Sequence, residues 1–470
     1  MLKRQKLLIG LAIAISVILC IELAIRGYQF HQGVLSNTIS NQQSFISYFD
    51  RFRVGIEYLA LNVIYLVWLL KNSLYGKFFR FTKILQRAAL FIAFAFIGYP
   101  ITTDIILYLH YGLMSLKGVN PFITGAGEFN TALSPFVVWG QSSTYGPVAL
   151  IFFISSALLV PISLFLGIYF FKFLCVIFHI FNGYLIWHEL KAKPYQSWVT
   201  LAYLISPFIL FEQVVNAHVD VLISTTLIIS ILCVKYRHYL TGILALWAGV
   251  FTKTLPIVWL PLVAVFLLKK QRWKSIAIAA CLSLAICLAM YFTVLPTAQA
   301  WKSLLNPGVV GRASGSLHSL LDAALQLSVI PGSLAQLRWP IIKGFTLIAS
   351  AGFVAYYIWS LAKIYFKPGK YEPNLSLIIG WVTLVLFLFA TPWYRPWYAT
   401  VLFPVIALNI NSQLFVLTSI TFCLCSSCSY YLLNANDIFN LLTVVPSILI
   451  LLLSRKILPF RGAEIQENRE

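Results

Sequence analysis

The chain has 470 residues, of which 60% are hydrophobic and only 10% are charged, and its formal net charge is +20. A soluble domain carries charge on roughly a quarter of its residues, so this composition excludes a mainly water-facing surface. The basic residues stand in short groups between apolar segments, which argues against nucleic acid as a partner.

Long uncharged runs separate the basic groups, and 129–171, 275–301 and 396–436 contain no Asp, Glu, Lys or Arg. Spanning a bilayer takes about 20 apolar residues, and backbone groups in lipid must be satisfied within their own segment. The sequence therefore predicts an all-α polytopic transmembrane helical bundle with roughly 11–14 membrane helices and with juxtamembrane helices in the first large outer loop. The predicted helices are 7–25, 54–70, 84–101, 147–165, 166–189, 198–212, 219–234, 240–252, 254–268, 275–296, 340–362, 375–391, 398–411, 414–432 and 438–454.

The first helix follows a basic start, but no good small-residue cleavage site follows it, so we interpret it as a membrane anchor. Short loops rich in Lys and Arg mark the cytoplasmic side, which predicts a multi-pass protein of the plasma (inner) membrane with both termini cytoplasmic. We group the chain into N-terminal membrane helices, a membrane core, and C-terminal membrane helices with a cytoplasmic tail. These are 1–83, 84–411 and 412–470. The loops predicted on the outer side are 102–146, 212–218, 297–339, 391–397 and 434–437.

Two regions conflict with a simple topology. The segments 240–252 and 254–268 are each too short to span, and we interpret them as a hairpin of half-helices with Lys253 at its bend. Between 147 and 212 three apolar helices occur where the charge rule demands an even number of crossings. One of these three is expected to lie partway in, or along, the membrane.

Asp104 closes the third helix and begins a half-amphipathic stretch that includes Tyr108. A carboxylate at the outer edge of the membrane is suited to take a proton from a sugar hydroxyl as a general base. Asp is also a favoured N-cap residue, so a purely structural role stays open.

The stretch Asn216-Ala217-His218-Val219-Asp220 opens a later helix on the same side. Three polar side chains in five residues between apolar runs suggest the lining of a cavity. A helix cap is the alternative, although a cap needs only one of them.

Lys253 stands alone between two apolar half-helices and needs an anion, and a phosphate is one candidate. Snorkelling of its ammonium to an interface is the alternative.

Arg312 and His318 lie in a polar loop that either closes over a phosphate or sugar or is simply exposed. The aromatic stretch from Trp393 to Tyr398 predicts either an interfacial belt or a surface that stacks on sugar rings.

In this order and on one predicted side, these motifs resemble those of the GT-C class of membrane glycosyltransferases. The chain is similar to bacterial polyprenol-phosphate-mannose-dependent mannosyltransferases over about 100–400. The motifs are Asp104; Gly118-Val119-Asn120-Pro121-Phe122; Tyr145-Gly146-Pro147; Asn216 to Asp220; Thr252-Lys253 with Pro256; and Pro396-Trp397-Tyr398 with Leu402-Phe403-Pro404.

The resemblance implies inverting transfer of a hexose, mannose-like, from a polyprenyl-phosphate sugar to a glycan, lipid or protein acceptor at the outer face. It implies that Asp104 is the catalytic residue and that Lys253 binds the donor phosphate, together with Arg312 and His318. Substrate binding or support falls to Tyr108, Tyr145, Asn216, His218, Asp220, Trp397 and Tyr398. No cofactor is required, although a divalent metal is possible if Asp104, His218 and Asp220 converge.

The chain departs from the family pattern at two places. Ile105, Ile106 and Leu107 stand where the family often has more charge, and two helices precede the usual start. A secondary transporter or flippase for a lipid-linked or small anionic substrate is the alternative function, because broken helices and buried charges suit transporters as well. A transporter would show internal repeat symmetry and midplane charges reachable from both sides, whereas the polar clusters of this chain are predicted on one side and we find no repeat in the sequence. A non-catalytic assembly factor is a third interpretation.

Overall fold

The computed structural model describes residues 2–35, 48–71, 74–305, 313–327, 336–366, 374–433 and 437–457. Helices make up 79% of it, and the described residues form no strand, which confirms the all-α prediction. The main helices are α1 (Leu2–Leu35), α2 (Tyr48–Leu70), α3 (Phe81–Ile97), α4 (Asp104–Leu116), α5 (Pro147–Ala157), α6 (Leu164–Glu189), α7 (Gln196–Ile205), α8 (Pro207–Ile209), α9 (Asp220–Lys235), α10 (Tyr239–Val250), α11 (Trp259–Lys269), α12 (Trp273–Thr293), α13 (Ala298–Leu305), α14 (Leu317–Leu327), α16 (Arg338–Phe366), α17 (Leu375–Val385), α18 (Leu402–Leu408), α19 (Gln413–Leu433) and α20 (Asp437–Ile457).

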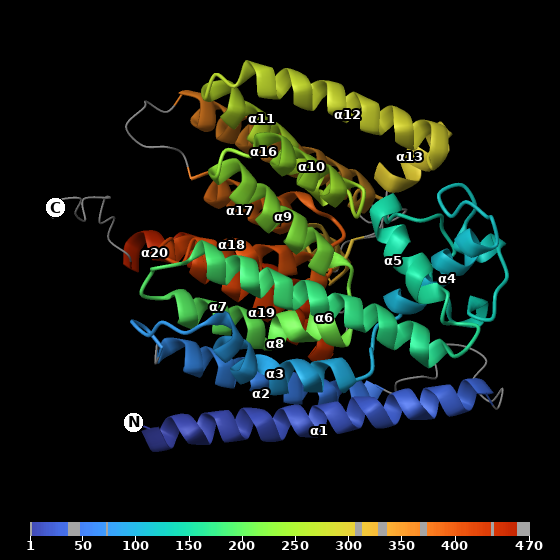
Figure 1. The fold of residues 1–470 in the computed structure, drawn as a ribbon, viewed down its shortest axis with the longest axis vertical. Coiled ribbons are helices and arrows are strands. Elements are labelled where there is room, and N and C mark those ends of the chain that lie inside the picture. Colours follow the sequence, from blue (N-terminus) through green and yellow to red (C-terminus); the bar gives the residue numbers. More distant parts are fainter. Residues whose placement is uncertain are drawn as a thin grey trace.

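Seven helical stretches in the described part of the chain are long and apolar enough to cross a membrane. They are Lys6–Gly33, Phe52–Leu70, Leu164–Glu189, Gln196–Val215, Trp273–Thr293, Arg338–Phe366 and Gln413–Leu433. Many of these helices run side by side across the bundle (Figure 1). The protein is therefore a multi-pass membrane protein.

Short and broken helices resolve both topological conflicts. α5 has 11 residues and rises about 16 Å, roughly half the hydrocarbon thickness, so it is the partial helix among the three predicted between 147 and 212. α10 and α11 are also too short to span, and Lys253 lies between them, which confirms the predicted hairpin of half-helices. The sequence missed α13 and α14, which lie inside the predicted loop 297–339.

Two hydrophobic clusters divide the interior. The larger one joins α1–α3, α7, α9–α11 and α17–α19, and it includes residues on both sides of the boundaries predicted at 83/84 and 411/412. The smaller one surrounds α4 and α5 and includes Phe122, Phe136 and Val219. The segment between η4, a π-helix (Leu210–Val215), and α9 passes from the first cluster to the second. The polar side chains 216–220 therefore lie at the junction of the two clusters.

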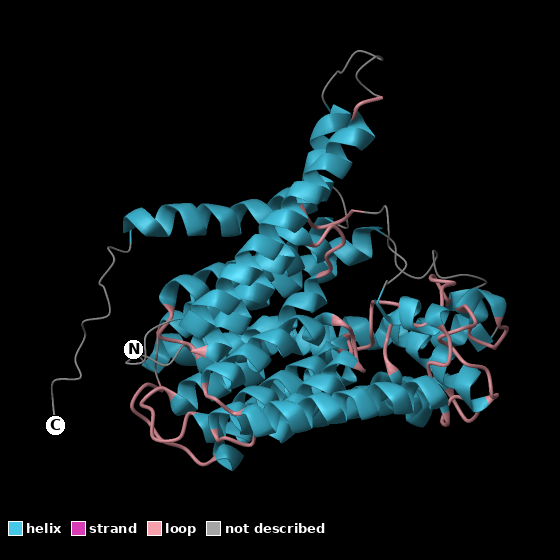
Figure 2. Cartoon of the chain, turned by 90° about the horizontal axis from the view of Figure 1, so that it is seen from above, coloured by secondary structure: helices cyan, strands magenta, loops and turns pink. Residues whose placement is uncertain are grey.

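The two ends of the bundle differ in content. α1 begins and α20 ends at one end, whereas α4, α5 and α13 lie at the other, and the view from above agrees (Figures 1 and 2). Segments predicted to face the outer side meet at this second end. Ser303 in α13 donates to the carbonyl of Ser143, and Ser314 exchanges backbone hydrogen bonds with Pro392 and Tyr394.

The close contact between α4 and α5 depends on Gly112. A Cβ built at Gly112 would lie 2.4 Å from the Phe153 carbonyl oxygen and 2.6 Å from Ala157 Cβ. Backbone cannot yield at such a distance as a flexible side chain can, so any side chain here separates the two helices. α4 carries Asp104, so this contact also positions the candidate site.

We predict that Gly112→Ala lowers the free energy of unfolding by about 1–3 kcal/mol, because it overpacks the α4–α5 contact. Gly352→Ala is the matched control, since a Cβ at Gly352 meets nothing within 4 Å. The control should be neutral or stabilising by up to about 1 kcal/mol. Denaturant or thermal unfolding of the purified proteins measures both, and equal effects would contradict the packing argument.

Candidate active site

Asp104 is the first residue of α4, where a negative charge is favoured by the helix dipole. Thr103, not Asp104, is the N-cap residue, and its side chain makes no capping hydrogen bond. The linker before α4 is held from outside the helix, because the backbone N–H of Ile101 donates to Asn216 Oδ1 at 3.1 Å. The Asp104 carboxylate is 14% exposed. It is thus a partly accessible carboxylate on a fixed support, not the cap of its helix.

His218 lies between two carboxylates. Its Nδ1 is 3.5 Å from Asp104 Oδ2 and its Nε2 is 3.6 Å from Glu212 Oε2. Both distances exceed a normal N–H···O hydrogen bond, so the interactions are electrostatic in this state. The ring stacks on the indole of Trp397 with centroids 4.1 Å apart and planes 12° from parallel. The preceding residue, Ala217, has φ +54°, a left-handed conformation that a non-glycine residue adopts only when its surroundings impose it.

Glu212 is a fully buried carboxylate in the π-helix η4. The Ser427 hydroxyl donates to Glu212 Oε1 at 2.8 Å and the Tyr431 hydroxyl donates to Oε2 at 3.0 Å. A buried carboxylate needs such donors, because an unpaired charge in an apolar surrounding is very costly. Tyr431 also accepts from Asn216 Nδ2 at 2.9 Å, so α19 supports both ends of this polar segment.

Asp220 and Lys253 form an ion pair. Lys253 Nζ donates to Asp220 Oδ1 at 2.8 Å and to Oδ2 at 3.0 Å, and Asp220 is almost completely buried. Lys253 Nζ also lies 4.1 Å from the ring centroid of Tyr398, a cation–π contact. Asp220 is the anion that the lone lysine needs. This explains why a charged side chain is stable between two apolar half-helices.

Tyr145 and Tyr108 form the wall beside Lys253. The ring of Tyr145 is 6.0 Å from Lys253 Nζ, and its hydroxyl accepts from the Tyr108 hydroxyl at 3.4 Å. Gly146 brings this wall against the Lys253 turn, since its N–H donates to the Thr252 carbonyl at 3.0 Å. A Cβ at Gly146 would lie 2.2 Å from the carbonyl oxygen of Phe251, so only glycine permits this approach.

The segment Trp393–Tyr398 closes the remaining side. It continues as the 3₁₀-helix η7 (Pro396–Val401), which carries Trp397 and Tyr398 to His218 and Lys253. The guanidinium of Arg395 lies 4.4 Å from the Trp393 ring centroid, and its buried Nη1 atom has no hydrogen-bond partner. The same guanidinium lies 5.4 Å from the Tyr430 ring centroid, and the backbone N–H of Tyr398 donates to the Arg395 carbonyl at 3.0 Å.

Nine of the eleven residues predicted for the site converge here. They are Asp104, Tyr108, Tyr145, Asn216, His218, Asp220, Lys253, Trp397 and Tyr398. His318 is buried in α14 and contacts the Phe345 ring, and neither of its ring nitrogens has a hydrogen-bond partner among the described residues. Burial lowers the pKa of His318, which disfavours the cation that phosphate binding needs. Arg312 lies outside the described residues.

The sequence did not single out Glu212, Ser427, Tyr431 or Arg395 as site residues. Glu212 carried the clearest signal, because a lone Glu in an apolar helix must have partners. Ser427 and Tyr431 are small or common residues in a long apolar helix and carry no such signal. Within the described residues, no three His, Cys, Asp or Glu side chains are arranged to hold a metal ion.

One comparison with known proteins finds a matching family. The family model described as alpha-(1->6)-mannopyranosyltransferase, N-terminal domain, matches residues 11–269, more than half of the chain. The match starts within α1 and ends with α11, so it contains Asp104, His218, Asp220 and Lys253 as well as the two N-terminal helices interpreted above as additions. No curated protein and no solved structure matches the chain.

We predict that Asp220 and Lys253 are energetically coupled. Asp220→Asn and Lys253→Met should each destabilise the protein, because each leaves one buried charge unpaired, and the double variant should cost less than the sum. A coupling energy of about 1–3 kcal/mol is expected for groups in direct contact. A double-mutant cycle on the unfolding free energy measures it, and strictly additive effects would contradict the pair.

Proposed function

We propose that this chain, which belongs to the alpha-(1->6)-mannopyranosyltransferase family of GT-C type mannosyltransferases, takes its mannose from a polyprenyl-phosphate donor. We also propose that the transfer takes place at the outer face of the membrane. The family establishes mannosyl transfer from a sugar donor to a glycan acceptor. The observation that carries the proposal is the partly accessible Asp104 carboxylate beside His218, in one polar cluster with Lys253.

Asp104 acts as the general base in this proposal. It takes the proton of an acceptor hydroxyl while that oxygen attacks the anomeric carbon of mannose. The bond from the anomeric carbon to the donor phosphate oxygen breaks, and its electron pair leaves with the phosphate. His218, at 3.5 Å from Asp104 and flanked by Glu212, orients the carboxylate and stabilises its charge.

Inversion of the anomeric centre follows from the positions of the carboxylates. A retaining path needs a second carboxylate free to act as a nucleophile. Asp220 is the nearest candidate, but both of its oxygens accept from Lys253 and it is almost completely buried. Glu212 is fully buried behind His218. Asp104 is thus the carboxylate that remains available, which supports a single displacement.

The donor phosphate needs positive charge that is not already neutralised. An ammonium has three N–H donors, and Lys253 gives two of them to Asp220, so one remains for a phosphate oxygen. Arg395 adds a second cation, because its Nη1 atom is buried without an acceptor. Together they stabilise the charge that develops on the leaving phosphate. The roles of Arg312 and His318 in phosphate binding stay predictions.

A lipid-linked donor and an outer site are consistent with the architecture. The cluster lies at the end of the bundle that carries α4 and α5, opposite the beginning of α1 (Figure 1). The basic residues Lys3, Arg4 and Lys6 at that beginning favour a cytoplasmic N-terminus. A donor held in the bilayer by its polyprenyl chain would reach the cluster laterally, at the level of the interface.

We predict that Asp104→Asn lowers mannosyl transfer roughly 100- to 10,000-fold, because an amide cannot accept the hydroxyl proton. Transfer from radiolabelled polyprenyl-phosphate mannose in membranes containing the variant measures this. Asp322→Asn is the control, since Asp322 pairs with Arg338 in α14 and α16, away from the cluster. Unchanged transfer by Asp104→Asn would eliminate Asp104 as the base.

The donor and the sidedness have their own test. A short-chain, water-soluble polyprenyl-phosphate mannose supplied to sealed right-side-out vesicles should support transfer, whereas sealed inverted vesicles should not use it until they are permeabilised. GDP-mannose supplied to purified enzyme should give no transfer. Transfer from GDP-mannose would reject the lipid donor, and activity in inverted vesicles alone would reject the outer face.

A further inference from the structure

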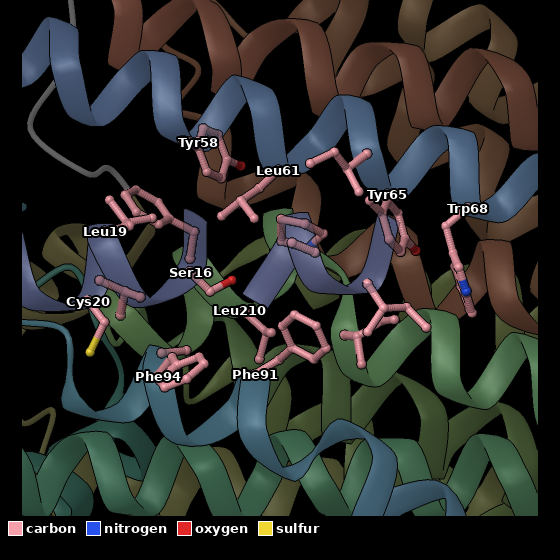
Figure 3. Close-up of a pocket in the computed structure, with 18 of the residues that line it drawn as sticks. Ser16, Leu19, Cys20, Tyr58, Leu61, Tyr65, Trp68, Phe91, Phe94 and Leu210 are labelled. Carbon is pink, nitrogen blue, oxygen red and sulfur yellow. The ribbon is translucent and has the colours of Figure 1, made fainter. Parts of the chain in front are cut away.

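A cavity lies behind the candidate site, among α1, α2, α3 and the α8–η4 segment. Its volume is 340 Å³, and it is partly open to the outside. Figure 3 shows Tyr58 and Leu61 of α2 on one side of the cavity and Phe91 and Phe94 of α3 on the other, with Leu19 contributed by α1. No residue predicted for mannosyl transfer lines this cavity, and the reaction proposed above makes no use of it.

The lining of the cavity is almost entirely apolar. It includes buried aromatic and aliphatic side chains such as Leu23, Tyr65 and Trp68. Water gains too few hydrogen bonds to occupy such a space, and an empty space forfeits the dispersion contacts of its walls. Along α1 the lining extends from Leu8 to Leu23, a helical rise of about 22 Å. An elongated hydrocarbon chain fits these dimensions, whereas a compact polar ligand does not.

Among the described residues that line the cavity, the one charged side chain is basic. Arg87 of α3 belongs to the lining and is exposed, and its guanidinium lies 4.3 Å from the Phe79 ring centroid. No carboxylate accepts from Arg87 among the contacts of the described residues. Lys77 and Arg80 in the connection between α2 and α3 are also exposed, and so is Lys83 in the first turn of α3. Basic groups beside a membrane helix attract anionic lipid headgroups.

We propose that this cavity is a binding site for one membrane phospholipid with an anionic headgroup. One acyl chain fills the cavity among α1, α2 and α3, and Arg87 donates to the phosphate of the headgroup. The two requirements are independent, because the apolar space selects a chain and the basic rim selects a negative charge.

The bound chain would also support the candidate site from behind. Leu210, Phe211 and Val215 line the cavity and belong to the π-helix that carries Glu212. Tyr58 lines it as well, and its hydroxyl lies 2.8 Å from Ser427 Oγ, the donor to Glu212. Filling the cavity therefore adds packing contacts to the elements that hold Glu212 beside His218.

Photo-crosslinking tests the site directly. The purified full-length protein is placed in phosphatidylcholine nanodiscs that contain phosphatidylglycerol with a diazirine on its acyl chain, and labelled peptides are mapped by mass spectrometry. We expect adducts on the lining residues of α1, α2 and α3. Leu61→Trp fills the cavity from α2 and should abolish these adducts. Ala12→Phe fills it from α1 and should have the same effect. Leu347→Trp, on the exposed face of α16, is the matched control and should keep them.

The headgroup contact has a separate readout. Arg87→Gln should weaken labelling by the phosphatidylglycerol probe roughly tenfold, as expected for one lost charge-assisted hydrogen bond. It should leave labelling by an equivalent phosphatidylcholine probe unchanged. Phosphatidylglycerol should also raise the unfolding midpoint of the unsubstituted protein but not that of Leu61→Trp.

Three results would overturn the proposal: labelling that does not change in Leu61→Trp and Ala12→Phe, equal labelling by both headgroups, or displacement of the probe by unlabelled polyprenyl phosphate. The last would assign the cavity to the tail of the sugar donor. None of these measurements depends on mannosyl transfer, so the proposal can fail while the proposed reaction stands, and the reverse is also true.

Discussion

Ionised side chains inside a lipid-embedded bundle are stable only when they neutralise one another, and the functional end of this protein depends on that constraint. Asp220 and Lys253 form a direct pair, while Asp104 and Glu212 lie on either side of His218. Glu212, His218 and Asp220 share the segment 212–220, whereas Asp104 and Lys253 come from two other parts of the chain. Their mutual need for partners therefore fixes how α4, η4, α9 and the α10–α11 hairpin meet. The same constraint that stabilises the fold also assembles the groups that chemistry requires.

Irregular helix geometry is what lets the pairs form. A regular α-helix directs its side chains at fixed angles and satisfies its own backbone, so it leaves little freedom to place a charge. Glu212 stands in a π-helix, and Trp397 and Tyr398 stand in the 3₁₀-helix η7. Such departures are rare in helices and are concentrated at functional sites. The left-handed φ of Ala217 belongs to the same pattern, because it turns His218 between the two carboxylates.

The sequence was sufficient for the apolar membrane helices, because such spans carry a strong signal in composition and length, but it missed the short helices α13 and α14. It also identified the polar residues of the cluster, since each stands out against an apolar background. It could not predict their pairing. Lys253 was assigned to a phosphate because nothing in the sequence indicates that Asp220, 33 residues away, is its partner. Glu212 was passed over because its donors, Ser427 and Tyr431, are more than 200 residues away. His318 was included from a loose match to the family, and its role in phosphate binding stays a prediction, with the ring buried beside Phe345.

In the proposed reaction, the ion pair between Lys253 and Asp220 leaves another cation to balance the negative charge of the donor phosphate. In the described structure Asp220 balances Lys253, so the pair is neutral, and a phosphodiester brings one further negative charge. In the proposed reaction Arg395 would balance it, because its buried Nη1 atom lacks an acceptor and its residue precedes η7, which carries Tyr398 to Lys253. Lys253 would then orient the phosphate through its remaining N–H, while Asp220 would keep the lysine paired. A carboxylate base and a phosphate-binding cation can therefore share one small cluster without neutralising each other, because a second carboxylate holds the cation in place.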